Sequence, residues 1–559
     1  MSEAWWKNAV VYEIYIRSFF DSNGDGIGDL EGIRQKLPYI ETLGADAIWI
    51  TPFFTSPRID NGYDISDYTA IDPEYGTMDD FRLLLQDAHE RGIRVILDMV
   101  LNHTSSDHPW FQESRSSRLA EKRDWYIWRD VPNNWGSQFG GSAWHYDESS
   151  GQYYLGLFSA AQPDLNWRNP KVREALKEVL RFWAETGVDG FRLDVISLIG
   201  KPTEFLDAPV NETGFSDFHP FVANQPEAHK YLRELRKEVF EPYGLVTIGE
   251  AAGVTLEEAA KYCAPNREEL DMVFQFEHVG LDGSEAYKWT ERRIDVEALK
   301  EVLYRWQSGT EGRFQNTLFW CNHDQPRIVS RLGDTGAFRE RSAKMLMTVL
   351  FLMEGTAFLY QGQELGTVGG GLKKPEELRD IEGIQAYQNL IQSGLSEEAA
   401  FLIVAEKTRD NARTLMQWSS EINAGFSEGT PWIKAGEAFQ TINAAEQLQR
   451  ENSPFSYCRR LLRLRREDEC FTNGSFRSCD NIEGVIAYER GTGAAHAFVI
   501  GNMTAETKTY KLPDAFQNGE ILITNCPNSD YMETGTLQPY ECLVVKAGSS
   551  AGSQTHLRF

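Results

Sequence analysis

The chain has 559 residues, more than a single hydrophobic core usually accommodates, so we expect one large domain with smaller domains attached. Its formal net charge of -27 argues against nucleic-acid or membrane partners and favours a neutral substrate, although such acidity also promotes solubility. The seven cysteines form no CxxC or Cys/His pattern, so we expect neither a disulfide framework nor a zinc site. The first residues lack a charged leader with an apolar stretch, and no segment could span a bilayer, which predicts a cytoplasmic protein.

Strand-like and helix-like runs alternate from the start of the chain, which is typical of βα units and a parallel sheet. The strand-like runs are VVYEIYIRSF, DAIWIT, IRVILDMV, GFRLD, LVTIGE, DMVFQF, TLFWCN and TAFLY. The helix-like runs cover residues 30–43, 79–91, 171–187, 226–241, 295–306, 338–353 and 454–468. Eight such strands predict an α/β fold that closes into a (β/α)8 barrel, or TIM barrel.

Two stretches interrupt this alternation, and both follow predicted strand ends, so both should lie over the active-site face. Residues 104–167 contain the short strand-like runs WHYD and GQYYLGLF and predict a small inserted β-rich domain after the third strand. Residues from about 366 to 432 form a second insertion. Short alternating runs predict a C-terminal antiparallel β domain over residues 479–559. The catalytic barrel would then comprise residues 1–103 and 168–478.

Three carboxylates stand at the ends of strand-like runs: Asp194 in GFRLDVI, Glu250 in LVTIGEA and Asp324 in LFWCNHDQPR. A parallel barrel presents side chains at these positions to its active-site face. Cleavage of a glycosidic bond needs an acid for the leaving oxygen and a second carboxylate at the anomeric carbon. Arg192 lies two positions before Asp194 and would point the same way, which would hold a nucleophile ionised. Taken alone, such an Arg-x-Asp is more often a structural ion pair.

Four segments resemble the signature regions of the α-amylase family, glycoside hydrolase family 13: DMVLNH, GFRLDVI, the strand ending in Glu250, and NHD. QPDLNW resembles a fifth region of the oligo-1,6-glucosidase subgroup, and the resemblance covers nearly the whole chain. It implies that Asp194 is the nucleophile of a retaining reaction and that Glu250 is the general acid/base. It also implies that Asp324 binds ring hydroxyls and favours the distorted transition state. Retention further implies that the first two carboxyl groups lie about 5 Å apart.

The same resemblance implies how the terminal glucose is held. Tyr63 would stack under its ring, and His103 and His323 would hydrogen-bond to it. Asp64 and Arg409 together would hold the far hydroxyl. Closing that end of the pocket would force the enzyme to take one glucose from a non-reducing end.

Residues around the bond to be cleaved carry a hint about its linkage. Val195 follows the nucleophile, and in related enzymes Val at this position accompanies activity on α-1,6 bonds, whereas Thr tends to accompany α-1,4 specificity. Lys288 in AYKWT resembles a contact to the leaving sugar in the dextran-glucosidase branch, and Phe158 should supply an apolar wall. These residues favour a retaining, exo-acting α-glucosidase that acts on short α-1,6-linked oligosaccharides.

The segment DSNGDGIGDLEG resembles an EF-hand calcium loop, with Gly26 at the turn. It departs from that pattern at Gly32, where the bidentate Glu would stand, and it lacks the usual flanking helices. Relatives bind Ca²⁺ at this loop, so we expect a structural Ca²⁺ ion and no organic cofactor. The expected oxygen ligands are Asp21, Asn23, Asp25, the carbonyl of Ile27 and Asp29.

Other features of the sequence do not decide which sugar is the leaving group. Gln363 stands where relatives usually carry Glu, and the following TVGGGLKKPEELRD is glycine- and lysine-rich. LFWCNHDQPRIVSRLGD resembles trehalose-6-phosphate hydrolases, for which Lys201, Lys373 and Lys374 are the candidate phosphate contacts. Sucrose isomerases and glucosyltransferases share the same scaffold and are further alternatives. The expected partner is a small oligosaccharide only, and a monomer is favoured over an oligomer.

Overall fold

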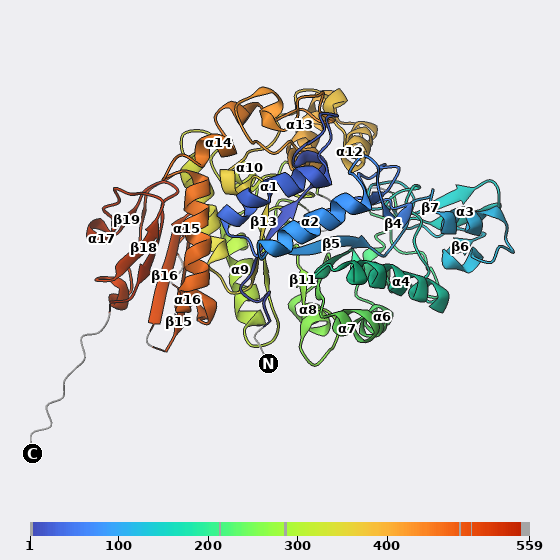
Figure 1. Ribbon diagram of the computed structural model, residues 1–559, viewed down its shortest axis with the longest axis horizontal. Helices are drawn as coiled ribbons and strands as arrows, with labels where there is room; N and C mark the ends of the chain where they lie inside the picture. Colours follow the sequence, from blue (N-terminus) through green and yellow to red (C-terminus); the bar gives the residue numbers. More distant parts are fainter. Residues whose placement is uncertain (1–3, 212–213, 284–287, 480–481, 494, 549–559) are drawn as a thin grey trace, which may run out of the picture.

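A parallel eight-stranded sheet forms the centre of the computed structural model, which describes residues 4–211, 214–283, 288–479, 482–493 and 495–548 (Figure 1). Its strands are β1 (Val10–Ile14), β2 (Ala47–Ile50), β5 (Arg94–Val100), β9 (Gly190–Asp194), β10 (Val246–Glu250), β11 (Met272–Phe274), β12 (Thr317–Leu318) and β13 (Thr356–Tyr360). They are arranged in the order β11-β10-β9-β5-β2-β1-β13-β12. The end strands of this order meet where Thr317 Oγ1 donates to the carbonyl of Val273 (3.0 Å), so the sheet closes into a nearly complete barrel. The predicted (β/α)8 fold is confirmed.

The strand sequences are continuous apolar runs because helices and interior side chains cover both faces of the sheet. Every residue of β1, β2, β9, β10 and β13 is buried. Inside the barrel, the Trp49 ring stacks on Phe274 (centroids 5.6 Å apart), and Phe274 packs edge-on against Phe358 (4.6 Å). This packed interior gives the polar residues at the strand ends a rigid floor.

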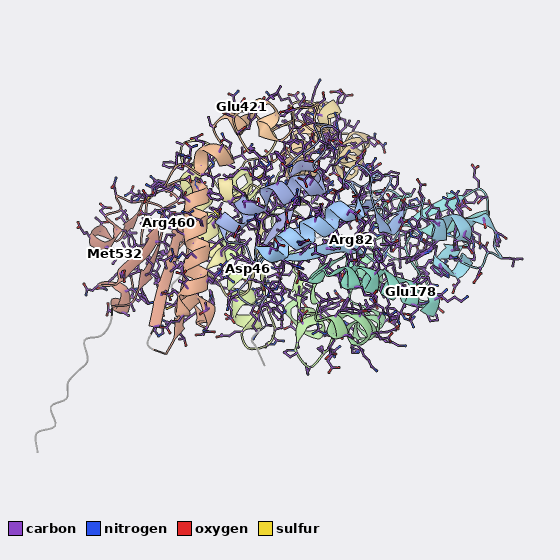
Figure 2. All side chains as sticks on the ribbon, in the orientation of Figure 1. Asp46, Arg82, Glu178, Glu421, Arg460 and Met532 are labelled. Carbon is purple, nitrogen blue, oxygen red and sulfur yellow. The ribbon has the colours of Figure 1, made fainter. Side chains whose placement is uncertain are left out.

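Seven helices cover the outside of the barrel near the positions predicted for them (Figure 1). They are α1 (Leu30–Leu43), α2 (Met78–Glu90), α4 (Pro170–Thr186), α6 (Pro226–Leu235), α9 (Val296–Thr310), α11 (Arg339–Phe351) and α15 (Pro454–Glu467). Their ends follow local chemistry: Thr77 and Asp80 form a capping box at the start of α2, and left-handed glycines end α1 and α4. Exposed charged residues such as Arg82, Glu178 and Arg460 lie on their outer faces (Figure 2).

The two insertions lie on the barrel as different kinds of structure. The first contains a three-stranded antiparallel sheet of β6 (Trp128–Arg129), β8 (Gln152–Leu155) and β7 (Trp144–Asp147). The second contains two helices, α12 (Ile381–Gln392) and α13 (Glu397–Lys407), which the sequence patterns did not predict. Gly140 of the first insertion lies against the side chain of Asn389 on α12, so the two insertions meet.

A five-stranded antiparallel sheet follows the barrel, in the order β14-β15-β16-β20-β18. Its strands are β14 (Ser475–Ser478), β15 (Val485–Thr492), β16 (Ala495–Asn502), β18 (Glu520–Thr524) and β20 (Cys542–Lys546). The sheet therefore begins before the predicted boundary at residue 479, because Ser475–Ser478 pairs with β15. Buried Arg490 of this sheet donates to the carbonyl of Leu352 at the end of α11 (2.9 Å), which fixes the domain to the barrel. No helix among the described residues is long and apolar enough to cross a membrane.

Candidate active site

The carboxyl ends of β9 and β10 place Asp194 and Glu250 around one guanidinium. Arg192 Nη1 donates to Asp194 Oδ1 (2.7 Å), and its Nη2 donates to Glu250 Oε2. Nη1 also donates to Asp98 Oδ1 (2.8 Å), so one cation serves three carboxylates from neighbouring strands. All four side chains are buried or nearly so. The structure therefore brings the expected nucleophile and the expected acid/base together.

The ionisation of Asp194 differs from the sequence-based expectation. Burial raises its pKa well above the ordinary value; Arg192 opposes this rise, while Glu250 and Asp98 add to it. The expectation that Arg192 would keep the nucleophile ionised was incomplete, because burial and the two neighbouring carboxylates outweigh the effect of the guanidinium. Asp194 therefore ionises at a higher pH than a free aspartate does.

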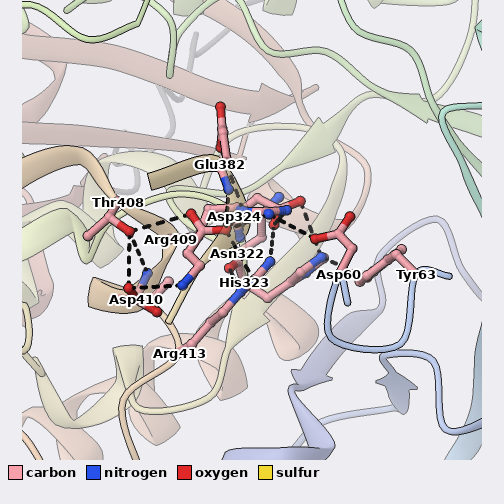
Figure 3. Close-up of polar contacts among 12 residues, drawn as sticks. Asp60, Tyr63, Asn322, His323, Asp324, Glu382, Thr408, Arg409, Asp410 and Arg413 are labelled. Atoms are coloured by element: carbon pink, nitrogen blue, oxygen red, sulfur yellow. Dashed lines mark hydrogen bonds and ion pairs between the residues drawn. The ribbon is translucent and has the colours of Figure 1, made fainter. Parts of the chain in front are cut away.

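Asp324 lies in the loop after β12 and faces three cations (Figure 3). Arg413 Nη2 donates to its Oδ1 (2.8 Å), and Arg409 Nη1 lies 3.5 Å from the same oxygen. His323 Nε2 lies 3.3 Å from Oδ2. Burial opposes ionisation, but His323, Arg409 and Arg413 together lower the pKa of Asp324 well below its ordinary value. Asp324 is thus a fixed anion, suited to accepting hydrogen bonds from sugar hydroxyls.

The two expected sugar-binding histidines have different surroundings. His323 Nδ1 lies 2.7 Å from the carboxylate of Glu13, whereas His103 Nδ1 lies 3.2 Å from the amide nitrogen of Asn102. Burial lowers the pKa of His103, against the opposing effect of Asp164. For His323, burial is outweighed by Asp324 and Glu13, which raise its pKa to about 9.

Aromatic rings pack against the two histidines. The ring of Tyr63 stacks on His323 (centroids 5.2 Å apart, interplanar angle 4°), and its hydroxyl donates to Asp98 Oδ2 (2.9 Å). Phe158 lies against His103 (centroids 5.1 Å apart) and packs on Phe139. The structure thus brings Tyr63 and Phe158 to the walls where the sequence places them.

The expected pairing of Asp64 with Arg409 is wrong, because Asp60 occupies that place. Arg409 Nη2 donates to Asp60 Oδ1 (2.8 Å), while Gln162 Nε2 donates to Asp60 Oδ2 (3.0 Å). The fully buried Asp64 instead accepts the amides of Ile59 (2.8 Å) and Asp60 (3.1 Å). Burial, together with Asp60, raises the pKa of Asp64 to about 6. Asp64 therefore braces the turn from within, and Asp60 faces Arg409.

Val195 and Lys288 were both expected to contact the leaving group, and their surroundings differ. Val195 has a left-handed backbone (φ 36°, ψ 38°), which is strained for a β-branched residue, and its N–H donates to Glu250 Oε2 (3.2 Å). Lys288 Nζ forms an ion pair with Glu382 Oε2 (2.5 Å), whose carboxylate also lies 3.6 Å from Arg409 Nε. The pair joins the rim of the site to the Arg409 network.

The predicted calcium loop follows β1 and packs its acidic side chains on its own backbone. Asp21 accepts amides from Gly24 and Gly26 (both 2.7 Å), and Asp29 accepts that of Gly32 (2.6 Å) at the start of α1. Burial raises the pKa of Asp29, although the backbone amides of Ser22 and Gly32 oppose this rise. Among the described residues, no three His, Cys, Asp or Glu side chains are placed to hold a metal by themselves, so Asn23 and a carbonyl would be needed.

Comparisons with known proteins agree with this geometry. Residues 13–474 match the family model for the alpha amylase catalytic domain. An oligo-1,6-glucosidase of Bacillus cereus is 46% identical over 556 residues, which cover 98% of this chain and 100% of that protein. The chain belongs to the α-amylase family. As a member of this family it is a glycoside hydrolase, and its substrate is a carbohydrate.

Two solved structures of the α-amylase family match the whole architecture. The trehalose-6-phosphate hydrolase of Bacillus licheniformis is 43% identical, with a TM-score of 0.91 over 98% of this chain and 100% of that chain. The isomaltulose synthase of Klebsiella sp. LX3 is 38% identical, with a TM-score of 0.94 and the same coverage. Relatives with different reactions thus share the fold.

Sequence reasoning missed several members of this α-amylase-family site. Asp60 and Gln162 lie in the quoted motifs DNGYDISDY and QPDLNW, so the signal was present but was assigned to the wrong aspartate in the first motif. Arg413 belongs to the same TRDNART run as Arg409, one helical turn later. Phe139, whose ring lies 5.0 Å from the Arg409 guanidinium carbon, has no recognisable motif.

We expect Asp60→Asn to reduce kcat/KM about 100-fold, mainly through KM, because a charged hydrogen bond contributes about 1.5–3 kcal/mol. Asp64→Asn should keep kcat/KM within about threefold but lower the melting temperature, because its amide cannot accept both backbone N–H groups. Steady-state kinetics and thermal unfolding of both variants measure this. A large loss of activity in the Asp64 variant at unchanged stability would show that Asp64, as first expected, binds the substrate together with Arg409.

Proposed function

We propose that the protein is a retaining, exo-acting α-glucosidase that releases glucose from the non-reducing end of short α-glucosides, with a preference for α-1,6 linkages. One observation carries the exo assignment. Arg409, which is almost fully buried, lies between Asp60 (2.8 Å), Asp380 (2.5 Å) and Asp324 (3.5 Å). This cluster of ion pairs closes the pocket beyond Asp324, so a sugar chain could not continue past the terminal ring.

The reaction uses the pair joined by Arg192. The Asp194 carboxylate attacks the anomeric carbon, while Glu250 donates its proton to the glycosidic oxygen and the leaving sugar departs as an alcohol. A water molecule then gives its proton to Glu250 and attacks the same carbon, which frees Asp194 as a carboxylate. Two inversions give net retention. The Val195 amide and Arg192 both bind Glu250 Oε2, which leaves Oε1 for the proton.

The preference for α-1,6 bonds is supported by Val195 and by the relatives. The Val195 side chain packs in an apolar cluster with Trp135 of the first insertion and with Leu198 and Phe218. A hydroxyl-bearing Thr would place a polar group in that cluster, so Val keeps the wall beside the nucleophile apolar. The Bacillus cereus relative named for oligo-1,6-glucosidase activity is 46% identical.

The candidate phosphate contacts give less support to a phosphorylated substrate than to an uncharged one. Lys201 is buried and bonded to Asp164 Oδ2 (2.6 Å) and to the Asn102 side chain. Lys373 is exposed and paired with Glu437. Lys201 therefore offers no free cation to a phosphate. Lys373 and Lys374 are both exposed, and they remain the candidates for such a contact.

Incubation with isomaltose, maltose, sucrose, trehalose and trehalose-6-phosphate, followed by chromatography of the products, tests the assignment. We expect isomaltose to have the highest kcat/KM and to yield glucose. Preferred cleavage of maltose or trehalose-6-phosphate would overturn the α-1,6 preference. Formation of isomaltulose from sucrose would show that an acceptor sugar, rather than water, takes the glucosyl group.

Asp194→Asn should lower kcat by about 10⁴-fold or more, because an amide cannot form the glucosyl-enzyme. Its melting temperature should remain near that of the wild type, since Asn keeps the volume and accepts from Arg192. Asp107→Asn, an exposed Asp-to-Asn change in the same chain, is the matched control and should be fully active. Substantial turnover by the Asp194 variant would place the nucleophile elsewhere.

We also propose a structural Ca²⁺ ion bound by Asp21, Asn23, Asp25, the Ile27 carbonyl and Asp29. Asp21 and Asp29 are both buried, and the loop itself supplies only amide and hydroxyl partners, which favours a bound cation. Removal of Ca²⁺ with EDTA should lower the melting temperature by several degrees, and added Ca²⁺ should restore it. Elemental analysis without calcium and an unchanged melting temperature would refute the site.

A further inference from the structure

A buried glutamate outside the signature motifs contacts His323 of the site. Glu13, on β1, is 1% exposed. Its Oε1 accepts the ring Nδ1–H of His323 (2.7 Å) and also the backbone N–H of His323 (3.2 Å). Because both side chains are buried and directly bonded, the charge of each strongly affects the pKa of the other.

The other histidine of the site provides an internal comparison. His103 has the amide of Asn102 next to its Nδ1, and its Nε2 lies 3.0 Å from the carbonyl of Tyr63. An amide N–H at Nδ1 and a carbonyl at Nε2 fit a neutral ring with its proton on Nε2. His323 has carboxylates near both ring nitrogens, Glu13 at Nδ1 and Asp324 at Nε2 (3.3 Å), which fits a ring protonated on both.

His323 is also connected to the expected nucleophile. Its Nε2 lies 2.7 Å from the hydroxyl of Tyr63, which donates to Asp98 Oδ2 (2.9 Å). The other oxygen of Asp98 accepts from Arg192, which binds Asp194. Because the Tyr63 proton is used by Asp98, the tyrosine oxygen must accept at His323, which again requires a proton on Nε2.

We propose that Glu13 is a positioning residue that keeps His323 doubly protonated, so that its Nε2–H and positive charge face Asp324, Tyr63 and the bound sugar. The inference rests on the proposed glucoside hydrolysis but not on its linkage. Glu13 touches no substrate and acts only through His323.

The two carboxylates next to His323 both favour its protonated form. Burial lowers the pKa of His323, but Asp324 and Glu13 outweigh it and raise the pKa to about 9. Loss of the Glu13 charge should therefore move the pKa of His323 downward. The other titratable and charged groups around His323 and Glu13 are Tyr15, Tyr63, Asp98, Arg192, Cys321, Tyr360 and Arg413. Those groups are unchanged by a substitution at Glu13. Burial raises the pKa of Glu13 itself, although His323 and Arg192 oppose this rise.

Glu13→Gln tests the role, because its amide oxygen can still accept from Nδ1 while the charge is lost. If protonated His323 is the active form, activity falls as pH rises through its pKa. Deprotonation of the general acid Glu250 also lowers activity as pH rises, so the test is the difference between the two profiles: the basic limb of the variant should lie at a lower pH than that of the wild type. Near pH 6 the two should agree in kcat within about threefold. Glu364→Gln is the matched control: Glu364 is equally buried, binds Tyr12 (2.9 Å) and Tyr39 (2.7 Å), and should leave the profile unchanged.

NMR titration of histidine-labelled protein gives a readout independent of activity, since the chain has only 10 histidines and His323→Gln assigns the signal. His323 should remain protonated at pH 7 in the wild type and titrate at least one pH unit lower in Glu13→Gln. A neutral His323 in the wild type, or unchanged titration and pH profile in the variant, would overturn the inference. Failure of glucosidase activity would refute the proposed function and leave this titration to decide the inference. If the variant does not fold, the wild-type titration alone decides.

Discussion

The geometry of the site depends on the buried guanidinium of Arg192. It forms ion pairs with Asp98, Asp194 and Glu250, which stand on three adjacent strands, and it is 1% exposed. Three carboxylates in this space would repel one another strongly without it, and each buried ion costs several kcal/mol to desolvate. A planar cation that bonds each carboxylate once also restricts the direction in which each carboxylate points. One side chain on a barrel strand therefore holds Asp194 and Glu250 near each other.

A second set of cations comes from outside the barrel. Arg409 and Arg413 follow α13 in the second insertion, and both contact Asp324. Arg409 also binds Asp60, which in turn accepts a hydrogen bond from Gln162 of the first insertion. In the proposed reaction, the barrel supplies the reacting pair and the insertions supply most of the charged groups around Asp324. Relatives with the same barrel can thus act on different sugars by changing the insertions while the chemistry is kept.

The sequence predicted the barrel well because buried parallel strands are continuous apolar runs. Asp194 and Glu250 end two of these strands, and Asp324 lies in the loop after β12. The sequence predicted the second insertion poorly. In α13, the residues AAFLIVA form an unbroken apolar run with no helical period, although only Ala400, Phe401 and Val404 of it are buried. The wrong assignment of Asp64, in place of Asp60, as the partner of Arg409 has another cause. Two aspartates flank one turn, and only backbone dihedrals such as the left-handed Asn61 (φ 50°) decide which one faces the pocket.

The charges near Lys288 are arranged differently from those near Asp324. Where the proposed function places the glucose, the charged side chains are buried and ion-paired, as Asp324 is with Arg413. At the rim, Lys288 and Glu382 neutralise each other, and Val195 adds an apolar wall. A paired rim of this kind attracts neither anions nor cations, so it suits an uncharged leaving sugar better than a phosphorylated one. Selection of the leaving group would then rest on shape beside Val195, where a single methyl or hydroxyl changes binding by only about 1–3 kcal/mol.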